Sequence, residues 1–241
     1  MDGSSNPKKK AIVQGEFHQS DKDKNELLNR DLEDWDTLLV EGRDPVFNLK
    51  DSKFGFGYYA IGAISVRTII RCLNKFLELM GVLSGDAFDE LDIDVNNRID
   101  AQHRDIWAFT NRYTRWILLL FAALASIGLL YRPGFLGNIS ELFSIWHSLL
   151  VFFPFLPGFV HIFAVVNPTN SSERNEKMVE SIVEYTSENG YDRALILVGE
   201  MHRTGVSNSL EDRGWDVASN PTNSWAGRKL SSIYRKFGDW R

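Results

Sequence analysis

Apolar and polar positions are unevenly distributed along this chain of 241 residues, which has polar, charged ends and an apolar middle. Outside that middle, the pattern predicts short apolar strands in alternation with amphipathic helices. The expected elements are a strand over 11–13, a helix over 20–32, a strand over 35–40, a helix over 172–188 and a strand over 194–198. Strands that alternate with helices are typical of an α/β fold.

The apolar middle predicts a transmembrane helical hairpin over 114–166. Trp116 to Tyr131 is an uncharged run that would reach roughly 24 Å as a helix, a minimal span whose flanking residues reach the lipid headgroups. The second run, Leu142 to Val166, is long enough to span and contains Pro154 and Pro157, which membrane helices tolerate. The alternative is a buried core hairpin of a soluble protein.

Basic residues set the orientation that we expect for such a hairpin. Arg132 alone lies in the connecting turn, whereas five basic residues flank the two runs, so the positive-inside tendency places both polar parts in the cytoplasm. The five are Arg104, Arg112, Arg115, Arg174 and Lys177. We therefore expect a multi-pass membrane protein with two spans and with the lipid bilayer as a partner.

A further helix is expected where the apolar stretch from Phe54 to Val66 continues to Val82. Arg67, Arg71 and Lys75 recur at four-residue spacing and share one face, which marks a side that contacts solvent or lipid headgroups. Because a charge interrupts the apolar run early, the pattern favours a packed or interfacial helix over a membrane span.

These patterns divide the chain into four parts. We expect the N-terminal half of an α/β domain over 1–113, the transmembrane hairpin over 114–166, the C-terminal half over 167–220 and a basic, aromatic tail over 221–241. The net charge is −5 and the sequence contains no basic stripe, so nucleic acid is not an expected partner. The single cysteine cannot form an internal disulfide, and the sequence does not indicate an oligomeric state.

A doubled motif is the strongest functional signal. Gly-Glu-x-His follows the strand predicted over 11–13, at Gly15 to His18, and the strand predicted over 194–198, at Gly199 to His202. Each copy of the motif continues into a helix and a returning strand. We expect a mixed sheet built from these two repeats. In an extended segment, residues two apart point to the same side, so Glu16 should project with His18 and Glu200 with His202. If the two strands are neighbours, these side chains meet beyond the strand ends, together with Glu41.

Such a group of imidazoles and carboxylates has two chemical uses. It can hold a divalent cation such as Zn, Mn or Co with a water bound as the nucleophile. It can also perform general acid and base catalysis without a metal, because crowded carboxylates raise one pKa and a histidine titrates near neutrality. The structural alternative is that each Glu caps the following helix while each His packs beside the sheet.

The doubled motif resembles the superfamily that includes TraB, PrgY and the TIKI proteases. That superfamily is marked by two Gly-x-x-His motifs, matched here by Gly15 to His18 and by Gly199 to His202. A Glu at the end of the strand after the first motif is matched by Glu41, and an Arg-bearing helix before the second motif is matched by Arg174. The Glu inside each motif is also similar to the erythromycin-esterase-like and ChaN-like groups.

The resemblance implies a metal-dependent hydrolase of the peptidase type, which the hairpin predicted from the apolar runs would anchor in a membrane. It implies that His18, Glu41 and His202 hold the metal and that Glu16 and Glu200 act beside it. We expect Arg174 to bind a carboxylate or an oxyanion of a peptide substrate. A different class of function is a non-catalytic membrane regulator that binds or sequesters a peptide signal or a metal cofactor in the same crevice. A third alternative is a purely structural membrane protein.

Overall fold

The structure is a computed structural model that describes residues 8–16, 23, 34–43, 47, 50, 52–80, 93–96, 98–130, 156–167, 170–225, 227–229 and 231–232. The chain forms two compact units. Unit 1 combines 1–45, 87–102 and 171–241, and unit 2 combines 46–86 and 103–170. The boundary expected between 166 and 167 lies close to the one observed at 170, but α2 and α3, which the sequence groups with the N-terminal half, belong to unit 2.

Unit 1 is built on a five-stranded sheet with the order β3-β2-β4-β1-β5. The strands are β1 (Lys10–Glu16), β2 (Thr37–Val40), β3 (Asp94–Asn96), β4 (Arg193–Gly199) and β5 (Asp216–Asn220). The α/β class is confirmed, but the expected mixed sheet is wrong, since every neighbouring pair of strands is parallel. Each of the first four strands is joined to the next by a connection of more than a dozen residues, long enough to return the chain to the end of the sheet where a parallel strand must begin.

The two sequence repeats are interleaved in this sheet. β4 lies between β1 and β2, and β1 lies between β4 and β5, so each repeat encloses the first strand of the other. β1 and β4 pair in parallel with Glu16 opposite Gly199. The adjacency of the two motif-bearing strands, on which the expected site depends, is therefore confirmed.

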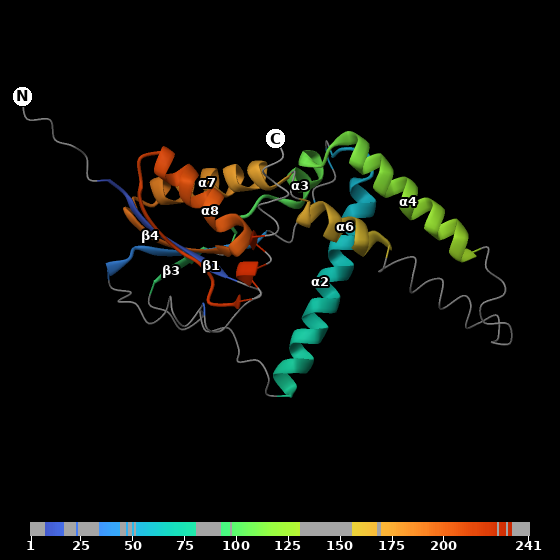
Figure 1. Cartoon of the computed structure of the whole chain (residues 1–241), viewed down its shortest axis with the longest axis horizontal. Coiled ribbons are helices and arrows are strands. Elements are labelled where there is room, and N and C mark those ends of the chain that lie inside the picture. The colour runs from blue at the N-terminus through green and yellow to red at the C-terminus, as the bar shows by residue number, and fades with distance from the viewer. Residues whose placement is uncertain are drawn as a thin grey trace, which may run out of the picture. The chain divides into compact units, whose positions relative to one another are not determined.

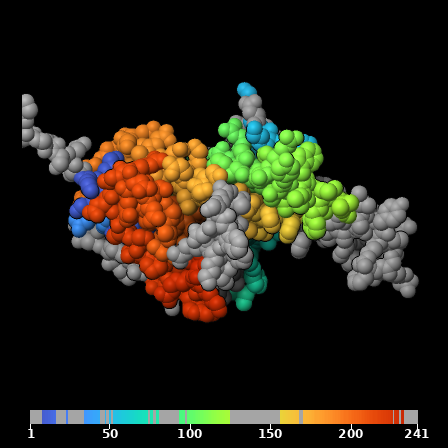
Figure 2. Space-filling model, turned by 45° about the horizontal axis from the view of Figure 1, so that its top comes forward, coloured from blue at the N-terminus to red at the C-terminus, as the bar shows by residue number. Residues whose placement is uncertain are grey.

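Two helices cover one face of the sheet, α7 (Ser171–Glu188) and α8 (Glu200–Asp212) (Figure 1). They pack against each other, and Figure 2 shows them side by side, in orange and red, at the surface of unit 1. The helix expected over 172–188 is thus confirmed. Gly190 follows it with a φ of +70°, the left-handed conformation that ends many helices.

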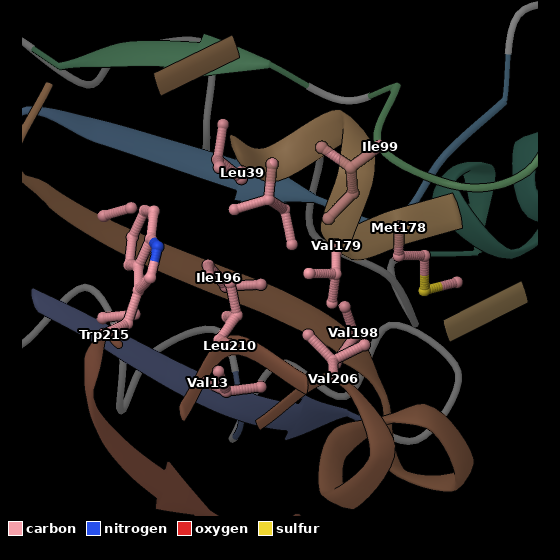
Figure 3. Close-up of a cluster of buried hydrophobic side chains, with 13 residues drawn as sticks. Val13, Leu39, Ile99, Met178, Val179, Ile196, Val198, Val206, Leu210 and Trp215 are labelled. Atoms are coloured by element: carbon pink, nitrogen blue, oxygen red, sulfur yellow. The ribbon is translucent and has the colours of Figure 1, made fainter. Parts of the chain in front are cut away.

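The core of unit 1 lies between these helices and the sheet (Figure 3). Side chains alternate across each strand, so Ile196 and Val198 of β4 face the helices while Leu195 and Leu197 point to the opposite side. Met178, Val179 and Ile182 of α7 are fully buried on the helical side. Because β4 is apolar on both faces, it reads as a continuous hydrophobic run, as central parallel strands do.

Unit 2 is helical and consists of α2 (Phe56–Leu79), α3 (His103–Phe109), α4 (Arg112–Leu130) and α6 (Leu156–Val166) among its described residues. α2 and α6 cross closely, since a side chain at Gly62 would meet the backbone of Pro157. Tyr59 and Trp107 are fully buried and in contact, with ring centroids 5.3 Å apart.

The transmembrane hairpin expected over 114–166 finds no support. Of the helices within the described ranges, none is both long enough and apolar enough to cross a membrane. α4 covers most of the first run, but α6 has only 11 residues, and residues 131–155 between them lie outside the described part of the chain. The first run therefore does form a helix over 112–130, and of the second run only the part over 156–166 is described, as α6.

Candidate functional site

The candidate site lies in unit 1 at the carboxyl edge of the sheet. After β1 the chain next enters the sheet as β2, two positions toward one edge, whereas after β4 it enters as β5, two positions toward the other edge. Neighbouring strands whose successors lie in opposite directions mark the point where open parallel sheets bind ligands. The ends of β1 and β4 are therefore where a ligand is expected.

Arg174, in the first turn of α7, is the centre of the charged groups here. Its side chain is 2% exposed and donates from Nε to Asp100 Oδ1 over 3.3 Å and from Nη2 to Asp100 Oδ2 over 2.9 Å. The same Nη2 donates to Glu41 Oε1 over 3.1 Å. Arg43 also pairs with Asp100. Glu41, Arg43, Asp100 and Arg174 are called the Arg174 cluster below.

The Arg174 cluster draws together three distant segments of the chain. Asp100 follows β3, and its backbone N–H donates to the carbonyl of Gly42 over 3.0 Å. Burial alone raises the pKa of Asp100, but the charges of Arg174 and then Arg43 outweigh that effect and bring the pKa below its usual range. Asp100 is therefore ionised at neutral pH and holds both arginines in place.

Glu41 connects this cluster to the second motif. Its Oε2 accepts the backbone N–H of Gly199 over 2.6 Å, directly before α8 begins at Glu200. A carboxylate at this position is favoured by the unpaired N–H groups and the positive end of the helix dipole. A side chain at residue 199 would come within 3.1 Å of Glu41 Oε2, so a glycine lets the backbone approach the carboxylate.

His202 is buried in the first turn of α8. Its Nδ1 lies 2.7 Å from Oδ1 of Asn175, which follows Arg174 on α7. Desolvation, and next the charge of Arg174, lower the pKa of His202 to about 4, against the opposing effects of Glu41 and Asp100. The imidazole is therefore neutral near pH 7. Since an amide oxygen only accepts, the proton lies on Nδ1, and Nε2 keeps its lone pair.

Glu200 belongs to a different group on the opposite side of α8. Both of its oxygens bind Arg203, at 3.1 to 3.2 Å, and Oε2 also accepts the N–H of Thr222 over 2.9 Å. Arg203 extends to Ser219 of β5 over 2.6 Å. Glu200, Arg203, Ser219 and Thr222 are called the Glu200 cluster below.

The predicted site residues are thus only partly brought together. Glu41, Arg174 and His202 meet, whereas Glu200 does not point with His202 as expected. The expectation assumed an extended segment, but α8 begins at Glu200, and residues two apart on a helix point roughly 200° apart. Glu16 ends β1 opposite Gly199, and His18 lies outside the described residues.

Three residues of the site, Arg43, Asp100 and Asn175, are not among the site residues predicted from the sequence. Arg43 lies two residues after Glu41 and reaches the same carboxylate partner as Arg174. Asn175 directly follows Arg174 on α7, and no sequence pattern indicates that its amide binds His202. The spacing of Arg43 from Glu41 was the available signal, because residues two apart on an extended segment share a side.

The donors for a metal ion are incomplete within the described ranges. No three His, Cys, Asp or Glu side chains stand close enough there to hold a metal. His202 offers a neutral imidazole whose Nε2 makes no hydrogen bond to a described residue, and Glu41 offers a carboxylate already held by two donors. The third expected ligand, His18, lies outside these ranges.

Comparison of the chain with protein-family models, with curated proteins and with solved structures finds no match.

Proposed function

We propose that this chain is a metal-dependent hydrolase of peptide or amide bonds, with its site at the carboxyl ends of β1, β2 and β4. One observation carries the proposal. His202 is buried and neutral, its Nδ1 is bound to Asn175, and its Nε2 remains available beside Glu41 at the point where the two Gly-Glu-x-His motifs lie in neighbouring strands. The resemblance to the TraB, PrgY and TIKI superfamily points to the same chemistry.

The residues at the site suit a borderline divalent cation such as Zn, Mn or Co. A neutral imidazole and a carboxylate are common ligands of these ions, and ligating carboxylates usually accept further hydrogen bonds, as Glu41 does from Gly199 and Arg174. His18, from the first motif, is proposed as the third ligand. A metal bound there would supply a water of lowered pKa as the nucleophile.

Asn175 sets the protonation of the proposed ligand. Because its Oδ1 fixes the proton of His202 on Nδ1, the ring presents the lone pair of Nε2 and cannot rotate without losing the bond. Asn175 in turn is tightly placed, since a side chain at Gly205 of α8 would come within 2.0 Å of its Nδ2. Asn175 is therefore a positioning residue, and it touches neither substrate nor metal.

The two arginines have separate tasks in the proposed reaction. Arg174 is almost fully buried and binds two carboxylates, so it positions Glu41 and is poorly placed to meet the substrate carboxylate assigned to it from the sequence. Arg43 is 18% exposed, and its Nε has no hydrogen-bond partner among the described residues. We assign to Arg43 the binding of a substrate carboxylate or of the oxyanion that forms during hydrolysis.

Metal content and turnover test the proposal together. The purified protein is analysed for bound metals and incubated with a peptide library whose products are read by mass spectrometry. We expect about one equivalent of metal, cleavage that a chelator abolishes, and activity lowered by 10²-fold or more in His18→Ala and His202→Ala. Asn175→Ala should lose 10- to 100-fold, as is usual for a residue that orients a ligand.

Glu200→Gln is the matched control, because Glu200 lies in the same motif as His202 but points to the Glu200 cluster. It should retain the metal and most of the activity. Metal-free protein whose activity is unchanged in both histidine variants would overturn the proposed metal-dependent site. Bound metal without any cleavage would instead favour the regulator that only sequesters a peptide or a metal.

A further inference from the structure

Charge is divided unequally between the two units. Unit 2 contains nine Lys and Arg residues against five Asp and Glu residues, whereas unit 1 contains eighteen against twenty-seven. A chain with a net charge of −5 thus carries a positive unit of +4 and a negative unit of −9. The partner of unit 2 is therefore expected to be anionic.

Three of the nine basic residues of unit 2 line a pocket of about 320 Å³. It is lined by Lys53, Phe54, Arg112, Arg115, Trp116 and Leu119. Three cations and two aromatic rings thus share one small concave surface. The rings of Phe54 and Trp116 stack with centroids 4.9 Å apart, and the two side chains are 71% and 52% exposed.

The pocket is a built feature of the fold. The indole N–H of Trp107 donates to the carbonyl of Phe54 over 3.0 Å and fixes the turn that presents Lys53 and Phe54. Gly55 follows with a φ of +84°, and a side chain there would meet Leu119 at 2.6 Å. Only glycine combines this conformation with so close a contact.

The three cations of the pocket lack acidic partners within the part of the chain that the structure describes. Arg115 makes one hydrogen bond there, from Nη1 to the carbonyl of Trp107 over 3.4 Å, and neither Lys53 nor Arg112 forms an ion pair. Burial, and next the charge of Arg112, lower the pKa of Arg115. Like charges held together without a carboxylate are stabilised by an anion from outside.

Beyond the pocket, α4 (green in Figure 2) exposes a row of apolar side chains. Its exposed residues recur at helical spacing: Trp116, Ile117, Leu120, Phe121 and Leu124. With a rise of 1.5 Å per residue, Leu124 lies about 18 Å along the helix from Arg112. The basic groups thus stand at one end of α4, the aromatic rings next to them, and the aliphatic side chains further along, which is the order of layers at a membrane surface.

The second half of α2 also separates basic from apolar side chains, on different sides of the helix. Arg67, Arg71 and Lys75 share one side. The other sides expose Ile69, Ile70, Leu73, Phe76, Leu79 and Met80, each by more than half of its surface. A helix with a basic side and an apolar side is suited to lie in a lipid interface.

We propose that Lys53, Arg112 and Arg115 bind the phosphate of an anionic phospholipid, and that the exposed apolar sides of α4 and α2 enter the adjoining acyl layer. A second copy of the chain fits less well, because it would bring two surfaces of the same positive charge together. This site is independent of the proposed hydrolase, since no residue of the Arg174 cluster takes part.

Vesicle binding by the full-length protein tests the proposal. The variants are a triple substitution of the pocket, Lys53→Gln with Arg112→Gln and Arg115→Gln, and a control that removes three exposed cations of unit 1, Lys10→Gln with Lys177→Gln and Arg228→Gln. Co-sedimentation is measured with neutral phosphatidylcholine vesicles and with vesicles that also contain phosphatidylglycerol. We expect wild type and control to bind the anionic vesicles, and the pocket variant to bind them roughly 100-fold less tightly, from about 1 kcal/mol for each cation.

Two further measurements identify the source of the phosphate. Brominated acyl chains should quench wild-type fluorescence more than that of Trp116→Phe, and soluble glycerol phosphate should not displace the protein from vesicles. The proposal is overturned by equal binding to neutral and anionic vesicles, by an unchanged pocket variant, or by displacement with glycerol phosphate, which would indicate a soluble anion. Self-association that hides the apolar sides without any vesicle binding would also overturn it. Matching thermal unfolding of all variants confirms that they are folded.

Discussion

The Arg174 cluster and the Glu200 cluster stand on either side of α8, and both place a buried carboxylate against a guanidinium. The Glu200 cluster is local, since Glu200 and Arg203 are three residues apart and their remaining partners lie within the next 22 residues. The Arg174 cluster joins residues 74 and 133 positions apart and surrounds His202. The Glu200 cluster therefore attaches α8 to the strand and segment that follow it. The Arg174 cluster assembles a site from segments that are distant in the sequence.

The position of a residue within a motif therefore does not determine its role in the structure. Glu200 and His202 occupy the same four-residue motif, yet the helix that starts there turns them to opposite sides. Glu41, which is outside either motif, takes the place beside His202 that the sequence pattern suggested for Glu200. Variants of both clusters test this division.

Removal of Arg174 should lower the free energy of unfolding more than any other substitution in the two clusters. Arg174→Met leaves Asp100, 1% exposed, with Arg43 as its remaining cation and leaves Glu41 without a cationic partner among the described residues. Breaking a buried ion pair in this way typically lowers the free energy of unfolding by ~3–5 kcal/mol. Arg203→Met should cost less, about 1–2 kcal/mol, because Glu200 keeps the N–H of Thr222. Urea denaturation of both variants measures the difference. Equal losses would mean that the two clusters are energetically alike.

The pH dependence of stability should isolate His202 in protein stripped of metal. The unfolded state binds a proton on this histidine below its ordinary pKa of 6.5, whereas the native state, with a pKa of about 4, does not bind one until far lower pH. The free energy of unfolding should therefore fall as the pH drops from 6.5 to 4, by about 3 kcal/mol from this group.

His202→Gln is the comparison for that measurement, because glutamine does not titrate. Its unfolding free energy should decline less steeply than that of the wild type between pH 6.5 and 4, as followed by urea denaturation at fixed pH values. Parallel curves for the two proteins would contradict the buried, neutral state of the imidazole.

Two glycine variants probe the clusters with matched steric changes. A Cβ at Gly205 would come within 2.0 Å of Asn175, and a Cβ at Gly15 would come within 2.0 Å of Glu200. Both Gly205→Ala and Gly15→Ala should lose ~1–3 kcal/mol of stability through overpacking. Only Gly205→Ala should also lower hydrolysis and metal affinity, since it displaces the residue that holds His202. Gly57→Ala, with no neighbour within 4 Å, serves as the control that should remain stable.

The smallest changes in stability should come from neutral replacements of Glu41 and Glu200. Glu200→Gln keeps the shape of its cluster, but its hydrogen bonds to Arg203 lose the negative charge. The free energy of unfolding should fall by about 1 kcal/mol. Glu41→Gln should lose a similar amount of stability but most of the hydrolytic activity, measured on the peptide library under identical conditions. Comparable activity in both variants would remove the functional distinction between the clusters.

The sequence predicted those features that depend on local pattern. Continuous apolar runs marked β1, β2 and β4 because central parallel strands are buried on both faces, and the doubled motif indicated correctly that β1 and β4 are neighbours. The short β3 was missed, since Asp94 to Asn96 carries only one apolar residue and lies at the edge of the sheet.

What the sequence could not show depends on the phase of helices and on long-range contacts. The side of α8 that each motif residue faces was fixed only by where the helix begins, at Glu200. The pairing of Asp100 with Arg174 joins residues 74 positions apart, for which one sequence contains no signal. The apolar middle predicted helices, and α4 and α6 form within it, but hydrophobicity alone did not indicate which apolar side chains of these helices are exposed.

The interleaving of the repeats also governs the order in which this protein can fold. The neighbours of β1 are β4 and β5. Ile12 therefore has no strand partner until Leu195, 183 residues later in the chain, has been made. During synthesis the first strand leaves the ribosome long before its partners do, and pairings so distant in sequence are slow to form. The sheet is therefore completed only when the last part of the chain is made, and neither repeat can close its own half of it beforehand.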